Sequence, residues 1–452
     1  MNIFTYQSRV DSTHYLAAVP APTWQKKVDL DRRLVIVDPQ QIRQGILGFG
    51  GAITEATTSV YALLSPEQKK AFIHAYFGKD GAAYSWERIP LGSTDFGLGS
   101  YCYVDEGDLT SKTFSLKHEE QYLFPFLKDV NDFLGHQPHL MASPWTPPAF
   151  YKDNHTPQHG GHLLPKYRQN YAAYETRYFQ EMAKKGYRFD LLSIQNEPEA
   201  VQTWDSCIYT AEEEAAYIPY LRTALDKAGF QSIGLYIWDH NRDEIVRRSN
   251  VTLASKEVRS LVKGVAYHWY CSNNHHNLDL VHEAFPDLHL LFTEGCVELA
   301  HPTTFKETAL GVWRHGEIYG ENMLEDFNHW NEGWIDWNLL LNEQGGPNYV
   351  GNFCEAPVMF DRKKKTLTFN PSFYFISHIS RFFKEGGRIV RSENDYEKGV
   401  FVASCLNPDS SLAIVIQNSS DKTISPSVLI QGLGSFIPEL PPHSITTYLL
   451  KK

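Results

Sequence analysis

Two glutamates of this chain lie at the ends of apolar runs, where an unpaired carboxylate is energetically unfavourable. Glu197 follows the apolar run FDLLSIQN and precedes Pro198, and Glu294 follows LLFT and precedes Gly295. A carboxylate that ends an apolar strand is expected either to pair with a cation or to do chemistry. Two carboxylates over one cavity are what the hydrolysis of a glycosidic bond requires. A single glutamate of this kind is explained equally well as the partner of an arginine or a loop amide, so the interpretation depends on the pair.

Regular elements must position these glutamates, and the middle of the chain alternates strand-like with helix-like patterns. Eight short strand candidates are separated by amphipathic stretches: residues 46–54, 84–90, 139–145, 189–198, 233–241, 264–270, 288–296 and 333–341. Capping boxes predict helices that begin after Ser65 and after Thr210, the second of which stops at Gly229. Eight β-then-α units predict an α/β fold, namely a (β/α)8 TIM barrel.

The spacing of the two glutamates fits opposite sides of the barrel mouth. At roughly 30 residues per β/α unit, three units separate them, which places Glu197 on the fourth strand and Glu294 on the seventh. In such barrels the active site lies at the carboxyl ends of the strands. Further polar and aromatic residues at predicted strand ends are candidates for the same site: Arg88, Trp145, Asn196, His268, Tyr270 and Trp337.

The two ends of the chain have a different pattern from the middle. Residues 397–450 contain short alternating apolar runs broken by Asn, Asp, Ser, Gly and Pro, which is typical of antiparallel strands, and residues 14–38 resemble them. We therefore expect a β-sandwich built from both chain ends beside the barrel. The expected divisions are residues 1–44 and 384–452 for the sandwich and 45–383 for the barrel. The basic run at 361–365 is expected to be a solvated hairpin turn.

Composition narrows the class of protein further. The formal net charge is −11, which argues against a nucleic-acid binder or a sensor of anionic membranes. Aromatic residues make up 13%, which suits flat sugar faces and equally an aromatic-rich core. The six cysteines form no CxxC pair, so no zinc or redox site is expected. No apolar run is long enough to span a membrane and no signal peptide is visible, which predicts a cytoplasmic protein, with non-classical secretion as the alternative.

A set of ordered motifs resembles glycoside hydrolase family 30 of the glucosylceramidase type. The matching stretches run from residue 48 to 357 in consistent order: GFGGAIT, RIPLGSTDF, ASPWTPPAF, NEPEA, WDSCIYT, HWY, TEGCVE, IDWNLLLNEQGGPN and NFCEAP. Asn-Glu-Pro alone is moderately specific, whereas the ordered set is highly specific. The segments around WDSCIYT and IWDHN are most similar to the bacterial branch of the family. The resemblance implies the same barrel and a retaining β-glycosidase.

The resemblance implies roles for the residues that do chemistry. Glu197 is similar to the general acid/base of the family and would need a raised pKa. Glu294 is similar to the nucleophile, which forms a covalent glycosyl-enzyme. A retaining mechanism implies carboxyl groups about 5–5.5 Å apart. Arg88 matches an arginine that holds the nucleophile ionised, although a purely structural ion pair would look the same.

The resemblance also implies a set of residues that bind the sugar or surround the carboxylates. Asp95 and Asn352 match sugar contacts, and Asn196 matches a partner of the 2-hydroxyl group. The remaining members of the set provide aromatic walls or lie beside the carboxylates: Trp145, Trp337, His268 and Tyr270. Cys296 matches a cysteine that we interpret as a small packing residue.

One loop departs from the animal members of the family. Those proteins have a tyrosine in the site nine residues after the acid/base, whereas this chain has Ser206. The loop after the fourth strand is therefore expected to shape the cavity differently, with Trp204 contributing. The preference for the leaving group does not transfer through this loop.

Two alternatives from other classes remain open at this point. A metal-dependent barrel hydrolase would draw on histidines in Gly- and Asn-rich loops: His155, His159, His162, His275 and His276. They lack the spacing of strand-anchored or helical zinc ligands, so we expect no metal and no cofactor. A catalytically silent sugar-binding or effector protein could share the fold. The expected partner is a β-linked glycoside or glycolipid: a β-glucoside, glucosylceramide, a β-xyloside or a β-fucoside.

Overall fold

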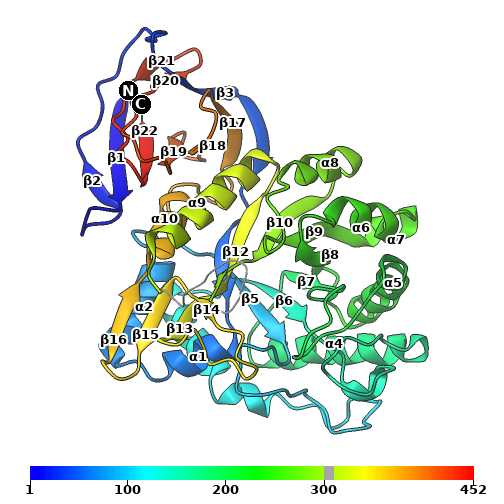
Figure 1. The fold of residues 1–452 in the computed structure, drawn as a ribbon. Coiled ribbons are helices and arrows are strands. Elements are labelled where there is room, and N and C mark those ends of the chain that lie inside the picture. The colour runs from blue at the N-terminus through cyan, green and yellow to red at the C-terminus, as the bar shows by residue number, and fades with distance from the viewer. Residues whose placement is uncertain (300–309, 452) are drawn as a thin grey trace.

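The computed structural model describes residues 1–299 and 310–451. Its centre is a closed barrel in which the strands neighbour one another in the order β10-β12-β4-β5-β6-β7-β8-β9 (Figure 1). The barrel strands all pair in parallel and have these bounds: β4 Gly48–Ala52, β5 Trp86–Leu91, β6 His139–Pro144, β7 Leu191–Ser193, β8 Gly234–Asn241, β9 Val262–His268, β10 His289–Glu294 and β12 Gly333–Asn338. Each falls within or overlaps one predicted strand, so the expected TIM barrel is confirmed.

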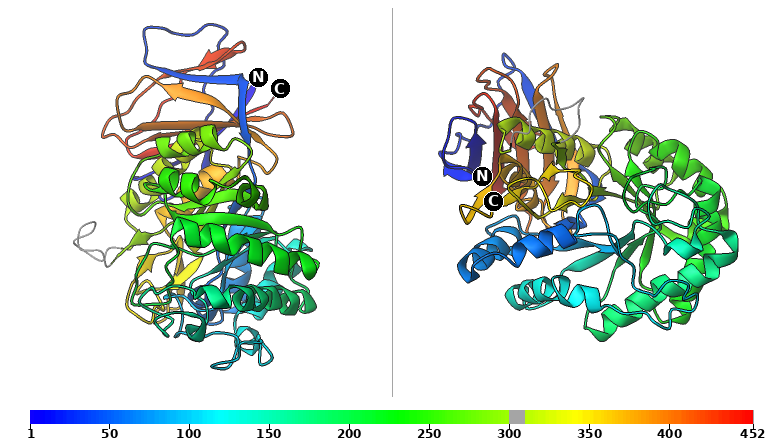
Figure 2. Two further views of the ribbon diagram at one scale, coloured as in Figure 1. Left: turned by 90° about the vertical axis from the view of Figure 1, so that its right-hand side faces the viewer. Right: turned by 60° about the horizontal axis from the view of Figure 1, so that its bottom comes forward.

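Helices surround the barrel (Figure 2). Their bounds are α1 Glu55–Tyr61, α2 Pro66–Phe77, α3 Leu123–Leu134, α4 Arg168–Lys184, α5 Ala211–Lys227, α6 Ile245–Thr252, α7 Lys256–Leu261, α8 His276–Ala284, α9 Trp313–Asn328 and α10 Pro371–Ser380. Both predicted capping boxes form: the side chain of Ser65 accepts from the Gln68 N–H at the start of α2, and that of Thr210 accepts from the Glu213 N–H at the start of α5.

Both chain ends contribute to a second body beside the barrel. Nine strands form one sheet in the order β2-β1-β22-β19-β18-β17-β3-β20-β21. Their bounds are β1 Asn2–Arg9, β2 Ala17–Val19, β3 Leu34–Gly45, β17 Arg388–Asn394, β18 Val400–Leu406, β19 Leu412–Asn418, β20 Ser427–Ile430, β21 Gly434–Phe436 and β22 Ser444–Lys451. β1 pairs antiparallel with β22 along its whole length, so the two termini lie together (Figure 1).

The sheet folds back on itself and thereby makes the expected sandwich. Phe436 of β21 packs against Tyr448 of β22 with 4.9 Å between ring centroids, although these strands stand far apart in the hydrogen-bonded order. Between the two layers lies a separate apolar core that includes Val37, Ile414 and Val428. Burial of alternate residues is what a strand with one packed face requires. The sandwich therefore has its own core and is tied to the barrel by β3, which leads directly into β4.

Two small sheets involve segments that follow the carboxyl ends of β10 and β12. β11 (Val297–Glu298) pairs with β14 (Cys354–Glu355), and β13 (Leu340–Asn342), β15 (Val358–Asp361) and β16 (Thr366–Phe369) form the other. β15 and β16 pair antiparallel, and the basic run at 361–365 turns between them with its lysines exposed, as the sequence predicted. Among the described residues, no helix is long and apolar enough to cross a membrane.

Glu87 of β5 carries a buried carboxyl group. Its side chain is fully buried, and neither of its oxygens has a hydrogen-bond partner among the described residues. Burial raises its pKa well above the ordinary value. Because the folded pKa lies above the unfolded one, the folded chain holds a proton that the unfolded chain has released. Rising pH therefore favours unfolding, by roughly 1.4 kcal/mol for each pH unit above the unfolded pKa until the folded pKa is reached.

Glu87→Gln removes this titration, and we expect the variant to be more stable than the wild type at pH 7.5 and equally stable near pH 4. Thermal unfolding followed across that pH range measures the difference. Glu106→Gln changes an exposed glutamate and serves as the matched control. An equal gain for Glu87→Gln at both pH values would show that packing, and not the buried charge, is responsible.

Candidate active site

A cavity of about 520 Å³ opens at the carboxyl ends of the barrel strands. Eight of the ten predicted site residues line it: Asp95, Trp145, Asn196, Glu197, Tyr270, Glu294, Trp337 and Asn352. The other two, Arg88 and His268, are completely buried and contact the lining residues. The structure thus brings the predicted residues to one place.

Glu294 is the last residue of β10 and is held by two donors. Arg88 Nη1 donates to its Oε2 at 2.6 Å, and the hydroxyl of Tyr270 donates to its Oε1 at 3.0 Å. The next residue is Gly295, where a Cβ would lie 2.6 Å from the ring of Phe292 and 2.7 Å from that of Trp269. Close packing therefore requires glycine there, and both carboxylate oxygens are fixed in direction.

Arg88 connects the carboxylates of the site. Its Nη2 donates to Asn196 Oδ1 at 2.7 Å, to Asp239 Oδ2 at 2.9 Å and to Ser143 Oγ at 3.0 Å. Its guanidinium lies over the ring of Trp145, 4.9 Å from the centroid. A buried arginine with this many acceptors is a rigid, permanently charged support. It is both the ion-pair partner and the orienting group that the sequence left as alternatives.

The sequence did not single out Asp239, which is central to this network. Its Oδ1 accepts from Thr293 Oγ1 at 2.6 Å and lies 3.1 Å from His268 Nε2. Burial would raise its pKa, but the charges of Arg88 and His268 hold it well below the ordinary range. Trp238 and Asp239 have positive φ angles of 73° and 49°, and the pairing of β8 with β9 shifts at this point. This bulge turns successive side chains into the site.

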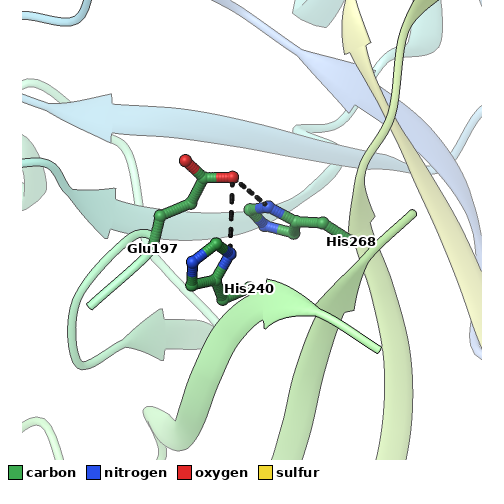
Figure 3. A group of neighbouring side chains, drawn as sticks. All are labelled: Glu197, His240 and His268. Carbon is green, nitrogen blue, oxygen red and sulfur yellow. Dashed lines mark hydrogen bonds and ion pairs between the residues drawn. The ribbon is translucent and has the colours of Figure 1, made fainter. Parts of the chain in front are cut away.

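Glu197 lies just beyond β7 in a strained backbone conformation. Its φ is +46°, and its N–H donates to the carbonyl oxygen of Asp239 at 2.9 Å. Its Oε1 lies 3.1 Å from His268 Nδ1 and 3.6 Å from His240 Nδ1 (Figure 3). His240 was also missed at the sequence level. The backbone bond to the neighbouring strand fixes where this carboxylate projects.

The pKa of Glu197 differs from the raised value that the acid/base role implied. Burial would lower the pKa of His268, but Glu294, Asp239 and Glu197 raise it to about 9, so this imidazole carries a proton at neutral pH. Burial raises the pKa of Glu197, yet the charges of His240 and His268 outweigh it, and the pKa lies below its ordinary value rather than above. Burial, aided by the charge of Glu197, raises the pKa of Glu294. The protonated form of Glu197 is thus favoured by acidic pH.

Asp95 lines the cavity and bonds to two asparagines of the segment 348–352. Its Oδ2 accepts from Asn348 Nδ2 at 2.9 Å and from Asn352 Nδ2 at 3.1 Å. Burial raises its pKa to about 7 despite these bonds. Asp205 ties the same segment to two other loops, since it accepts from the hydroxyls of Ser100 at 2.6 Å and Tyr349 at 2.9 Å. Asp205 thus joins three loops, and both asparagine side chains bond to the same oxygen of Asp95, Oδ2.

Replacement of Asp95 by Asn tests whether its ionised form binds the sugar. Above pH 7 the carboxylate accepts strongly from hydroxyl groups, and below pH 7 it gains a proton, so we expect the wild-type KM for an aryl β-glycoside to rise as the pH falls through about 7. Asp95→Asn should raise KM about 10- to 100-fold at pH 8 and remove the inflection. Initial rates between pH 5 and 8.5 measure both effects, and an inflection that persists in the variant would contradict the assignment.

In the loop after β7, Trp204 contributes to the cavity as expected. Trp204 and Gln202 line the cavity, whereas Ser206 does not. The Ser206 hydroxyl is buried in the loop, where it accepts from the Gly160 N–H at 3.0 Å. At this loop the cavity is therefore bounded by an indole and an amide.

The loop histidines proposed as metal ligands are held by other groups or lie apart. His162 pairs with Glu213 at 2.9 Å, His275 with Asp326 at 2.6 Å and His276 with Asp279 at 3.2 Å. Within residues 1–299 and 310–451, the acidic, thiol and imidazole side chains that converge in a geometry able to hold an ion are Glu197, His240 and His268. The loop histidines weighed as an alternative are thus not among the groups that converge in this part of the chain.

Comparisons with known proteins agree with this geometry. The model of the glycosyl hydrolase family 30 TIM-barrel domain matches residues 46–383, and that of the family's β-sandwich domain matches residues 388–448. The lysosomal acid glucosylceramidase of Mus musculus is 31% identical over 435 residues, covering 93% of this chain and 84% of the mouse protein. Putative glucosylceramidase 4 of Caenorhabditis elegans is 31% identical, covering 92% of this chain and 83% of the worm protein.

Solved structures are similar over the full length. The crystal structure of SrfJ from Salmonella typhimurium has a TM-score of 0.93 at 33% identity and covers all of both chains. The endo-β1,6-glucanase BT3312 has a TM-score of 0.86 at 28% identity and covers 100% of this chain and 99% of its own. On the family models, the full-length relatives and the paired carboxylates of the site, this chain belongs to glycosyl hydrolase family 30 and is a retaining β-glycoside hydrolase.

Proposed function

We propose that the protein removes a terminal β-D-glucosyl unit, with glucosylceramide as the first substrate to test. The observation that carries this proposal is the pairing of Glu197 and Glu294 in one cavity, which Asp95 also lines with a carboxylate able to accept from sugar hydroxyls. The likeness to glucosylceramidases supports glucose as the sugar and a sphingolipid as the aglycone.

The geometry supports the following first half of a double displacement. Glu294, aimed by Arg88 and Tyr270, attacks the anomeric carbon while Glu197 gives a proton to the leaving oxygen. The anomeric C–O bond to the aglycone breaks, and an ester bond to Glu294 forms. Asn196 accepts from Arg88, and in this proposal it binds the 2-hydroxyl group, a contact that strengthens in the transition state.

The second half restores the enzyme. Glu197, now a carboxylate, takes a proton from water, and the water oxygen attacks the anomeric carbon from the face that the aglycone left. The ester bond to Glu294 breaks, and glucose is released with its β configuration retained. The protonated His268 beside Glu197 stabilises the carboxylate form needed for this step.

A matched substrate panel tests the proposal. Release of the aglycone is measured from aryl β-glucoside, aryl β-xyloside, aryl β-fucoside and fluorescent glucosylceramide, and reducing ends are measured from a β-1,6-linked glucan. We expect the β-glucoside and glucosylceramide to be cleaved and glucose to be the sugar product. Cleavage of the xyloside or fucoside alone would change the sugar, and oligosaccharides from the glucan would favour the endo-acting function that BT3312 is named for.

A further inference from the structure

Three ligand atoms at the acid/base carboxylate converge on one point. Glu197 Oε1, His268 Nδ1 and His240 Nδ1 all lie within 4.8 Å of one another, and the carboxylate oxygen is 3.1 Å and 3.6 Å from the two nitrogens (Figure 3). Two ligands held about 2.1 Å from one zinc ion at a tetrahedral angle are about 3.4 Å apart. The separations around Glu197 therefore suit a small divalent ion with little movement of the side chains.

His268 is oriented from behind as metal-bound histidines are. Its second nitrogen, Nε2, lies 3.1 Å from Asp239 Oδ1, and Asp239 is fixed in turn by Thr293 and Arg88. A carboxylate on the far nitrogen of a ligating imidazole fixes its tautomer and makes it a stronger ligand. This support is rigid because all four side chains are completely buried.

Among the described residues, no hydrogen bond fixes the direction of His240 Nδ1. Its Nδ1 is buried and has no hydrogen-bond partner among the described residues, and at 3.6 Å from Glu197 Oε1 it is too far to make one. The ring rests against Trp238, with 4.9 Å between centroids. A buried imidazole nitrogen that faces a carboxylate oxygen across 3.6 Å is available to bind an ion between them.

The cavity around these atoms is acidic and open to water. Four carboxyl side chains line it: Asp95, Glu197, Glu294 and Glu298. The described lining residues include no lysine or arginine. Glu197 and His240 keep 15% and 14% of their side-chain surface exposed, which leaves room for a water as a further ligand. Two imidazoles and one carboxylate favour zinc-like transition-metal ions over Mg²⁺ or Ca²⁺.

We propose that Glu197, His240 and His268 form an inhibitory binding site for a divalent transition-metal ion of the zinc type. The ion binds the ionised carboxylate of Glu197 and displaces the proton on His268 Nδ1, which passes to the solvent. With the ion in place Glu197 cannot protonate the leaving oxygen, and the ion occupies the space of that oxygen. The ion is thus a competitive inhibitor and has no part in the reaction.

Zinc inhibition measured against a varied concentration of aryl β-glucoside tests the site on the full-length enzyme. We expect Zn²⁺ to raise KM with little effect on kcat, Mg²⁺ to have no effect, and His240→Asn to raise the inhibition constant at least tenfold relative to its own zinc-free rate. His276→Asn is the matched control, because His276 is 71% exposed and paired with Asp279 outside the cavity. An unchanged inhibition constant in His240→Asn would overturn the proposal.

Calorimetric titration with Zn²⁺ gives a second readout that needs no substrate and therefore stands apart from the proposed glucosidase activity. We expect one ion per chain in the wild type and in Cys271→Ser, and loss of that binding in His240→Asn and His268→Gln. Cys271 is included because this thiol also lines the cavity. Zinc binding that disappears only in Cys271→Ser would assign the ion to the thiol and contradict the three-ligand site.

Discussion

Glu294→Gln is expected to lose turnover of every glycoside that the wild type cleaves, by a factor on the order of 10⁶ in kcat, as other enzymes do when their covalent nucleophile is removed. The amide has the shape of the carboxylate, and it can still accept from Arg88 or Tyr270. It cannot supply the electron pair that forms the ester with the anomeric carbon. Binding of the glycoside should survive, since most of the cavity wall is unchanged.

Trapping of the covalent glycosyl-enzyme identifies the nucleophile directly. A 2-fluoro glucoside with a good leaving group should label the wild type with one fluoroglucosyl group, located by mass spectrometry on the peptide that contains Glu294. Glu332→Gln is a suitable control, because Glu332 pairs with His289 at the opposite end of the barrel strands. Label on a different peptide, or label on the Glu294→Gln variant, would show that another group is the nucleophile.

The barrel and the positions of the two glutamates could be predicted because they follow from local rules. Eight strand-like runs alternate with helix-like stretches, and the capping boxes at Ser65 and Thr210 depend on residues three apart in sequence. The spacing of Glu197 and Glu294 then placed them on strands across one mouth. Parallel strands of a barrel all point the same way, so residues at their ends must meet.

The rest of the site depends on backbone irregularity and on partners far apart in sequence. Asp239 and His240 face the site because a bulge with two positive φ angles interrupts the alternation of β8, and a period-two pattern has no means of showing this. The lowered pKa of Glu197 likewise requires that two imidazoles from β8 and β9 meet one carboxylate from β7. The ordered motifs were enough to predict the family, whereas this electrostatic arrangement is visible only in the three-dimensional structure.

The same arrangement explains why one site can hold an acid and a nucleophile. Arg88 bonds to Glu294 and Asp239, and His268 lies between Asp239 and Glu197, so five charged groups form one chain from nucleophile to acid/base. A change of charge on Glu294 therefore shifts the pKa of Glu197, and the reverse also holds, as expected for closely coupled titrating groups. Formation of the ester removes the negative charge of Glu294, which favours the carboxylate form of Glu197 at the step that needs a base.

Glu197→Ala should separate the two steps of the reaction by their need for a proton. An aryl glucoside with an acidic phenol needs no protonation to leave, so the ester on Glu294 should still form quickly, but water is no longer activated and kcat should fall about 10²- to 10⁴-fold. A glucoside with an alkyl leaving group needs the acid, so its kcat/KM should fall by a comparable factor. Steady-state rates on the two substrates, with a burst of phenol release from the first, measure the difference.

Azide completes the test, because it is a nucleophile that needs no base. In Glu197→Ala it should enter the space left by the carboxylate, attack the ester from the face of the departed aglycone, restore turnover of the aryl glucoside and yield β-glucosyl azide. In Glu294→Gly, azide should instead replace the missing nucleophile and yield the α anomer. The configuration of the azide product, read by NMR, therefore reports which carboxylate was removed. If Glu197→Ala gave the α anomer, the roles assigned to Glu197 and Glu294 would have to be exchanged.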